Sequence, residues 1–319
     1  MTPPMPIANP TLARLQRAIS LAWAVALLVC LAAVQIFGPS PARWSLFTLL
    51  LLGHAFVLGI EFMLATAINR RNATPPATTG QLLHAWLTES LAAPVVFLWR
   101  QPWRSNAPAD HLPADAQGRT GVLLVHGFVC NRGLWRPWLL RLRQRNVPFI
   151  AVNLAPVFGS IDDMLPVIEA AVQRLQAHTG RAPVVVAHSM GGLVLRRWRA
   201  QPGHAGRVGA VLTLGTPHHG TWLARWAFSR NGVQMRLGSP WLRHLQALEQ
   251  AHGAAGHAGF TCFHSHCDNI VFPASSATLP GARNVHLAGV PHVHMAAHPA
   301  PWAALLQALD AAQDGATDR

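Results

Sequence analysis

The 319-residue sequence predicts an α/β domain with a mainly parallel sheet, preceded by a two-helix transmembrane hairpin. Two apolar runs near its start are each long enough to cross a bilayer as a helix. Further on, short apolar runs alternate with helical stretches, which is typical of a parallel sheet buried on both faces. One of these runs leads directly into a serine and two glycines, a pattern that predicts a sharp strand-to-helix turn.

The composition fits a large core and membrane segments, because 51% of the residues are hydrophobic and only 12% are charged. The formal net charge is +13, and every cationic side chain is an arginine. The arginines are scattered, without a basic run interleaved with aromatic residues, so nucleic acid is not expected as a partner. The four cysteines show no C-x-x-C pair, and free thiols are expected, with a Cys262–Cys267 disulfide as the alternative.

The first apolar run spans Ile19–Phe37 and the second spans Trp44–Ile68, and a short segment rich in helix breakers joins them. We interpret residues 1–75 as a transmembrane helical hairpin. A cleaved signal peptide is the alternative for the first run. It fits poorly, because the second run would still anchor the protein.

The arginines that flank the two runs predict their orientation. Arg14 and Arg17 precede the first run, Arg70 and Arg71 follow the second, and the connecting loop has only Arg43. By the positive-inside rule both ends of the hairpin face the cytoplasm. The sequence therefore predicts a multi-pass protein of a bacterial inner membrane, with the domain that follows the hairpin on the cytoplasmic side.

Two ionisable residues lie inside the second run. His54 and Glu61 are seven residues apart, which places them on one face of a helix. Ionisable groups within a membrane mark functional sites by default. Here we favour a simpler role, a polar contact across the hairpin or near the membrane interface.

Residues 76–115 are expected to form a juxtamembrane segment that ends in a polar, proline-containing linker. Its apolar part, residues 81–99, predicts an amphipathic helix lying on the membrane surface. A third crossing is not expected, because the apolar stretch 91–99 is short and contains Pro94. A helix packed on the soluble domain remains the alternative.

The α/β domain is predicted to span residues 116–319. Six apolar runs within it predict the strands of the sheet. They are residues 121–126, 148–154, 182–188, 209–215, 259–264 and 284–289. Since the carboxyl ends of parallel strands meet at one edge, the loops that follow them are where functional residues are expected.

The segment "VVVAHSMGGLV", residues 184–194, carries the strongest chemical signal. It predicts a nucleophile elbow, in which a strained turn after His188 exposes the hydroxyl of Ser189 above the sheet. Strand and helix approach closely there, which requires small residues such as Gly191. The first position of the usual G-x-S-x-G pattern is Ala187, a departure of one methyl group. The alternative is a chance serine in a glycine-rich turn.

A serine nucleophile needs a base and an orienting acid. His292 lies in the loop directly after the last predicted strand and is favoured as the base over His294. Between Ser189 and His292 the only carboxylates are Glu249 and Asp268. Glu249 belongs to a helical stretch, whereas Asp268 follows a predicted strand by four residues. Asp268 is therefore the predicted acid.

The segment "LLVHGF" after the first strand predicts an oxyanion hole. Gly127, following His126, lets the backbone turn so that the N–H of Phe128 can face a substrate carbonyl oxygen. The second donor is expected to be the N–H of Met190, at the start of the helix after the serine. The histidine–glycine pair alone would be weak evidence, since many strand ends turn in this way.

Three motifs together, "HGFVCN", "AHSMGG" and "LGTPHHGT", resemble the bacterial esterase/lipase branch of the α/β-hydrolase superfamily. The resemblance covers roughly residues 116–310 and says nothing of the hairpin. It implies a Ser189–Asp268–His292 triad without a cofactor, acting on a lipid or small ester. A thioesterase, phospholipase or acyltransferase could use the same triad, and a non-catalytic membrane scaffold is the alternative from another class. The oligomeric state is left open.

Two segments of the catalytic domain allow more than one interpretation. Residues 216–258 could form a lid or the wall of an acyl-binding site, or an ordinary helical excursion. His218 and His219 could line the site or stabilise a turn. His264 and His266 share one face of a strand, which allows a zinc site, but no metal is expected because no second ligand cluster accompanies them.

Overall fold

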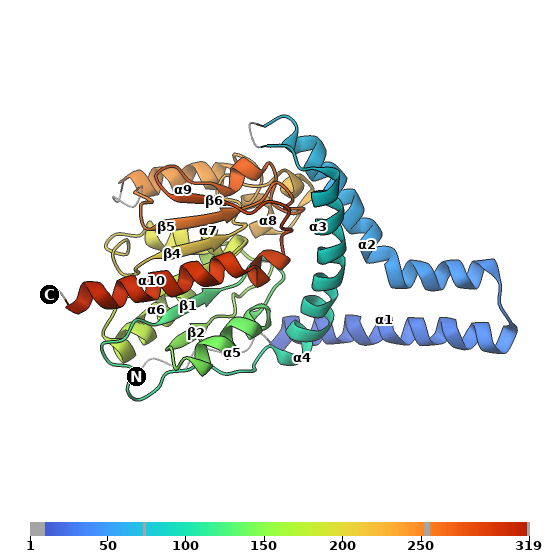
Figure 1. Cartoon of the computed structure of the whole chain (residues 1–319), viewed down its shortest axis with the longest axis horizontal. Helices are drawn as coiled ribbons and strands as arrows, with labels where there is room; N and C mark the ends of the chain where they lie inside the picture. Colours follow the sequence, from blue (N-terminus) through green and yellow to red (C-terminus); the bar gives the residue numbers. More distant parts are fainter. Residues whose placement is uncertain (1–9, 73–74, 252–255, 318–319) are drawn as a thin grey trace.

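The computed structural model describes residues 10–72, 75–251 and 256–317. The parts of the predicted hairpin at 1–9 and 73–74, and of the 216–258 stretch at 252–255, lie outside the described residues, as do 318–319. A layered α/β domain forms one part of the structure, and long N-terminal helices extend from one end of it (Figure 1).

Within the described residues the sheet has six strands, all parallel, in the order β2-β1-β3-β4-β5-β6. All six predicted strands are confirmed, and only β6 begins before its predicted run, by one residue. The strands are β1 Val122–Val125, β2 Phe149–Ala151, β3 Val184–His188, β4 Val211–Leu214, β5 Phe260–His264 and β6 Arg283–His286.

Helices cover both faces of the sheet (Figure 1). Successive residues of a strand point to opposite faces, so each strand contributes apolar side chains to two cores. Leu123 of β1 belongs to the core beneath α6, α7 and α9, whereas Val122 belongs to the core beneath α5 and α10. The helices are α5 Arg136–Gln144, α6 Leu165–Thr179, α7 Met190–Arg199, α8 Arg230–Gln234, α9 Pro240–Ala251 and α10 Pro299–Thr317. Short 3-10 turns are η2 Arg132–Trp135, η3 Asp162–Met164, η4 Trp222–Trp226, η5 Ala274–Ala277 and η6 His294–Ala297.

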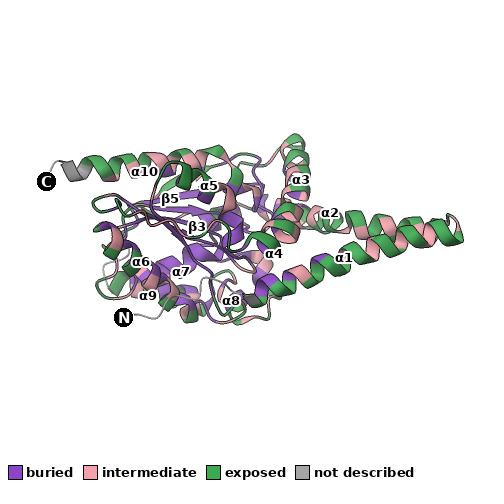
Figure 2. Ribbon diagram, turned by 90° about the horizontal axis from the view of Figure 1, so that it is seen from below, coloured by how far each residue is buried: buried purple, intermediate pink, exposed green. Residues whose placement is uncertain are grey.

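The N-terminal hairpin consists of α1 (Pro10–Phe37) and α2 (Pro41–Asn69), both long and apolar enough to cross a membrane. Figure 2 shows that most of their surface is exposed, whereas the central strands, such as β3, are buried. Large apolar side chains such as Leu28 and Phe56 are 65% and 69% exposed. Exposed apolar surface of this extent is costly in water but not in lipid.

The next helical run departs from the sequence-based expectation. Helix α3 (Thr79–Pro94) continues through a π-helical turn, η1 (Val95–Arg100), into α4 (Gln101–Arg104). Pro94 does not end the helix, and the run Thr79–Arg104 is itself long and apolar enough to cross a membrane. The expectation that the apolar stretch around Pro94 is too short to cross a membrane is therefore wrong. The Ser90 carbonyl, which receives no N–H from Pro94, accepts instead from His54 Nε2 (3.0 Å).

Helix α3 packs on the α/β domain, as the alternative interpretation of the sequence had it. Ala85 and Glu89 are almost fully buried, and Glu89 binds the backbone of the segment after β6. Figure 1 shows α3 running across the direction of α1, between the hairpin and the carboxyl edge of the sheet.

All four cysteines are free thiols.

Candidate active site

The predicted nucleophile lies between β3 and α7 in a strained conformation. Ser189 has φ 54° and ψ −130°, a region that residues with a side chain rarely adopt. Its N–H donates to the Leu214 carbonyl at the end of the neighbouring strand (2.8 Å), which helps to fix the turn. A Cβ on Gly191 would lie 2.5 Å from the His126 carbonyl oxygen. The close approach of strand and helix therefore requires glycine there, as the sequence pattern indicated.

The predicted oxyanion loop lies against the serine. A Cβ on Gly127 would be 2.7 Å from the Ser189 Cβ, so only glycine fits. Among the described residues, neither the Phe128 N–H nor the Met190 N–H has a hydrogen-bond acceptor. Both groups are thus available to an oxyanion.

The His126 ring fixes the turn before Gly127. Its Nε2 accepts from the Leu154 N–H (2.9 Å), so the proton is on Nδ1, which donates to the Gly127 carbonyl (2.8 Å). Burial lowers the pKa of His126 to about 4, although the carbonyl opposes this shift. The ring is therefore neutral at pH 7 and acts through its two hydrogen bonds.

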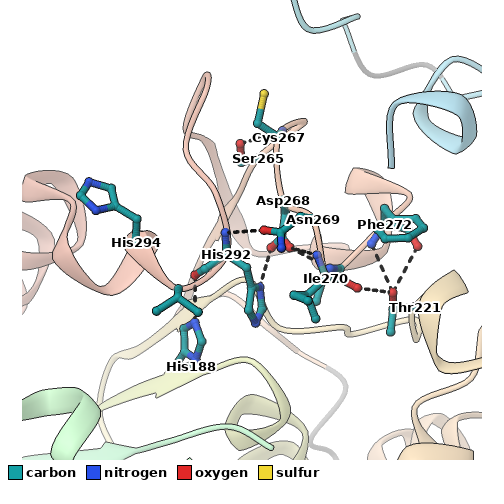
Figure 3. A network of polar contacts seen from close by, with 12 residues as sticks. His188, Thr221, Ser265, Cys267, Asp268, Asn269, Ile270, Phe272, His292 and His294 are labelled. Carbon is teal, nitrogen blue, oxygen red and sulfur yellow. Dashed lines mark hydrogen bonds and ion pairs between the residues drawn. The ribbon is translucent and has the colours of Figure 1, made fainter. Parts of the chain in front are cut away.

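The predicted acid and base are in direct contact (Figure 3). His292 Nδ1 lies 2.9 Å from Asp268 Oδ2, and the two residues are 4% and 1% exposed. The other oxygen, Oδ1, accepts from the N–H groups of Ile270 (2.9 Å) and Val271 (2.7 Å), which orients the carboxylate. A Cβ on Gly215, at the end of β4, would lie 2.9 Å from Asp268 Oδ2 and 3.0 Å from His292 Nδ1. The Asp268–His292 pair is thus packed directly against Gly215, where a larger residue would clash with it.

Electrostatics favour the charged form of His292. Burial lowers the pKa of its imidazole, but the Asp268 charge and hydrogen bond and the more distant Glu89 and Glu61 outweigh burial, so the pKa lies above its usual value. The rival His294 is directed away from Asp268 in Figure 3. The structure therefore brings Asp268 together with His292 and not with His294.

His188 links the serine turn to the His292 loop. Its Nε2–H donates to the His292 carbonyl (3.1 Å), and the two rings are 4.6 Å apart. Burial, followed by the nearby His292 charge, lowers the pKa of His188 to about 3, so this ring stays neutral. Among the described residues, no hydrogen bond joins the Ser189 hydroxyl to the His292 ring. Such bonds are often long or misaligned before a substrate is bound.

Similarity to solved structures identifies the architecture. The mature lipase BlEst2 of Bacillus licheniformis superposes with a TM-score of 0.54 at 17% identity, over 62% of this chain and 95% of that chain. Lipase B of Aspergillus fumigatus gives 0.52 at 22% identity, over 63% of this chain and 56% of that chain. The chain has the α/β-hydrolase fold. No family model matches the sequence. No curated protein matches it either.

The N-terminal helices contact the loops at the carboxyl edge of the α/β-hydrolase domain. Glu61 of α2 accepts from Asn269 Nδ2 (2.7 Å), and Asn269 Oδ1 in turn accepts from the His292 N–H (3.3 Å). Glu61 does not make the expected polar contact across the hairpin, because its partner is Asn269, the residue after Asp268. His54 does pair within the helices, with the Ser90 carbonyl (3.0 Å).

Glu89 of α3 makes a second contact of this kind. Its two oxygens accept from the N–H groups of Val293 (2.7 Å) and His294 (3.1 Å), directly after His292. Sequence reasoning missed Glu89. One signal was available, since Glu61 and Glu89 are the only acidic residues before Asp110.

Helices α1 and α4 contact the loop after the predicted oxyanion residues. The buried Gln16 side chain donates to the Val129 carbonyl (3.4 Å) and accepts from Asn131 Nδ2 (3.3 Å). Asn131 also donates to the Gln101 carbonyl (3.0 Å). Val129 has φ 52°, a strained value for a β-branched residue, so the helical contacts lie beside a strained turn.

The other candidate residues lie apart from the Asp268–His292 pair. Glu249 forms a buried ion pair with Arg196, with contacts of 2.9 and 2.7 Å, and lines a cavity of about 380 Å³ with His218 and His219. Neither Ser189 nor the Asp268–His292 pair lines this cavity. The buried ring of His218 contacts Thr213 Oγ1 (3.0 Å), which indicates a structural role.

The histidines around β5 use their ring nitrogens within the protein. His266 Nε2 accepts from the Gly289 N–H (3.2 Å), so Nδ1 carries the proton and donates to the Pro75 carbonyl (3.1 Å). His264 and His286 pack at this ring or beside it. Within the described ranges no group of three or more metal-ligating side chains is gathered.

The described part of residues 216–258 forms η4, α8 and α9. Thr221 anchors its start, because its hydroxyl donates to the Ile270 carbonyl (2.6 Å) in the loop after Asp268. Trp226 and Phe228 are 52% and 96% exposed. An exposed apolar segment that is hydrogen-bonded to the loop after Asp268 is compatible with a lid or with the wall of an acyl-binding site. Both roles stay predictions.

Proposed function

We propose that this chain is a membrane-anchored serine hydrolase that cleaves carboxylic esters of apolar acyl groups. One observation carries the proposal: the strained Ser189 turn lies at the same sheet edge as the buried Asp268–His292 pair. The α/β-hydrolase fold and its lipase neighbours agree with this assignment. Residues 116–319 would form the catalytic domain.

In the proposed reaction, Ser189 Oγ attacks the ester carbonyl carbon while His292 Nε2 takes the hydroxyl proton. Asp268 accepts the Nδ1–H hydrogen bond and stabilises the imidazolium that forms. The proton then passes to the leaving alcohol as the tetrahedral intermediate collapses to an acyl-enzyme. Water then attacks the acyl carbonyl carbon while His292 Nε2 takes a proton from it. His292 returns this proton to Ser189 Oγ as the carboxylic acid is released.

The negative charge of the tetrahedral intermediate would be stabilised by the N–H groups of Phe128 and Met190. Neither group has an acceptor among the described residues, and His126 holds the turn that carries the first of them. Preorganised donors of this kind typically lower the barrier by about 2.7–4 kcal/mol each.

We further propose that residues 1–75 anchor the enzyme as a transmembrane hairpin, with 76–115 as the juxtamembrane segment. The exposed apolar surface of α1 and α2 supports insertion. Both ends of the hairpin lie beside the α/β domain and its loop lies at the far tip (Figure 1). The distribution of the flanking arginines then favours a cytoplasmic catalytic domain. A reporter fused to the C-terminus tests this side: activity only on the periplasmic side would refute the orientation.

The test of the catalytic proposal is labelling with a fluorophosphonate probe, followed by a panel of esters. Wild type should react with the probe at Ser189 and hydrolyse p-nitrophenyl esters, and Ser189→Ala should do neither. Ser276→Ala is a matched control, because Ser276 is also a buried serine but lies in η5. Full ester hydrolysis by Ser189→Ala would refute the mechanism.

The ester panel also separates the alternatives that share this triad. Thioesters, phospholipids and an added acceptor alcohol distinguish a thioesterase, a phospholipase and an acyltransferase from a carboxylesterase. A wild-type protein that folds but is not labelled at Ser189 would favour the non-catalytic scaffold.

A further inference from the structure

We propose that Glu61 and Glu89 are positioning residues that hold the His292 loop, so that helices α2 and α3 complete the active site as well as attach it to the membrane. The inference rests on the proposed function, because it assigns these carboxylates to the geometry of the base. It concerns two side chains more than 200 positions from the loop, with sequence separations of 208 for Glu61–Asn269 and 204 for Glu89–Val293.

Glu61 acts through a single intermediate side chain. Asn269 donates from Nδ2 to Glu61 and accepts at Oδ1 from the His292 N–H, so its amide joins the helix to the backbone of the base. Asn269 is 1% exposed. A buried amide with both ends engaged cannot rotate without losing a hydrogen bond. The Glu61 contact therefore determines which group of Asn269 faces His292.

Glu89 holds the chain on the other side of His292, directly after it. Its two oxygens accept from two consecutive N–H groups, those of Val293 and His294. Glu89 is 1% exposed, and a carboxylate buried in this way is costly unless its oxygens are hydrogen-bonded. The bidentate contact fixes the direction in which the chain leaves His292, and with it the orientation of the ring.

Attachment alone does not explain these contacts, because α2 has a separate docking contact. Asn69 donates to the His266 carbonyl (3.1 Å) and accepts from the Ala274 N–H (2.8 Å), on segments that do not carry His292. The hairpin could thus be joined to the domain without any carboxylate near the base. Asn69 offers a matched control for that reason.

Charged and titratable groups reach His292 from several elements. Asp268 faces it from the loop after β5, His188 from β3, Glu61 from α2 and Glu89 from α3. The negative groups favour the imidazolium. Removing the charge of Glu61 should therefore lower the pKa of His292 and move the acid limb of the kcat/KM profile to lower pH.

The experiment uses the full chain in detergent or lipid nanodiscs, with ester hydrolysis and the rate of fluorophosphonate labelling as readouts. Glu61→Ala should lower kcat about ten- to a hundred-fold with little change in KM, since misplacement of a base by about 1 Å has effects of this size. Glu61→Gln keeps an acceptor for Asn269, so it should lose less and show mainly the shifted acid limb. Asn69→Ala should keep kcat near wild type.

Two further variants test the route of each contact. Because Glu61 acts through Asn269, the double variant Glu61→Ala/Asn269→Ala should be no slower than Asn269→Ala alone. Glu89→Gln is isosteric but offers one acceptor and one donor to two N–H groups, so it should lower kcat more than Glu61→Gln does. The isosteric variants keep the test valid if the alanine variants fail to fold, which circular dichroism would reveal.

Several outcomes would overturn the inference. If Asn69→Ala lost as much kcat as the glutamate variants, the Glu61 and Glu89 contacts would serve only to dock the helices on the domain. Independent, additive losses for Glu61 and Asn269 would exclude the route through the amide. Wild-type kcat in both glutamate variants would refute the inference while leaving the proposed function intact, whereas a wild-type protein without Ser189-dependent hydrolysis would refute the proposed function itself.

Discussion

Replacing Asp268 by Asn is the sharpest test of the Asp268–His292 pair. The carboxylate accepts three hydrogen bonds, two at Oδ1 from backbone N–H groups and one at Oδ2 from His292. The asparagine oxygen would keep the two backbone donors, because an NH₂ group cannot accept from them. The new NH₂ group would then face His292 Nδ1, where a donor already points.

The magnitude follows from this geometry. To avoid two opposed donors, His292 must give up its Nδ1 proton and carry it on Nε2, where it can no longer accept the serine proton. The same exchange in a serine protease triad lowers kcat by about 10⁴. At about 1.36 kcal/mol for each factor of ten, the barrier would rise by about 5.4 kcal/mol. The protein should still fold, since the backbone contacts of the side chain remain.

The assay is hydrolysis of a p-nitrophenyl ester by wild type, Asp268→Asn and His266→Ala, with thermal melting as a control for folding. His266 is a neighbour that bonds Pro75 and Gly289 and does not contact the pair, so its removal should cost about 1–3 kcal/mol of stability but less than ten-fold in kcat. Retention of more than a tenth of the wild-type kcat by Asp268→Asn would refute the reasoning. Equal losses of kcat in the two variants would instead favour a metal site at the histidines around β5.

Three other predictions follow from single contacts. The kcat/KM of wild type should fall as the pH drops through a value above 6.5, because the base must be neutral and its neighbours raise the pKa of His292; a midpoint below 6.5 in the pH–rate profile would contradict this. Gly215→Ala should abolish most activity, because its Cβ would meet Asp268 and His292. Gly203 also has a left-handed φ but open space around it, so Gly203→Ala should lose only about 1 kcal/mol of stability in a melting experiment. Equal activities of the two variants would count against the packing argument. Glu249→Gln leaves Arg196 buried without a counter-charge and should cost about 3–5 kcal/mol, or roughly 6–20 °C in melting temperature. Adding Arg196→Met should recover part of that loss, and a double variant as unstable as the single one would exclude this explanation.

Much of the fold could be predicted because it depends on local patterns. The buried strands are continuous apolar runs, and the turn at Ser189 requires small residues at fixed positions beside it. The expectation that the stretch around Pro94 is too short to cross a membrane failed, because the helical run continues from Thr79 to Arg104. The Ser90 carbonyl, which receives no N–H from Pro94, accepts from His54 on another helix, and the sequence does not reveal that contact. The direct Asp268–His292 contact followed from the shared edge of a parallel sheet, whereas the catalytic roles remain predictions.

The sequence by itself determined the order of the elements along the chain: an apolar hairpin, then the strands of the sheet, with a serine, an aspartate and a histidine in the segments that follow three of them. Hydrophobic periodicity and backbone sterics act over a few residues, and for that reason they can be recognised without coordinates. Only the tertiary structure decided what Glu61 and Glu89 bind. A carboxylate in an apolar helix needs a partner, but the identity of a partner some 200 positions away depends on how the helices pack against the sheet edge, which no local pattern encodes.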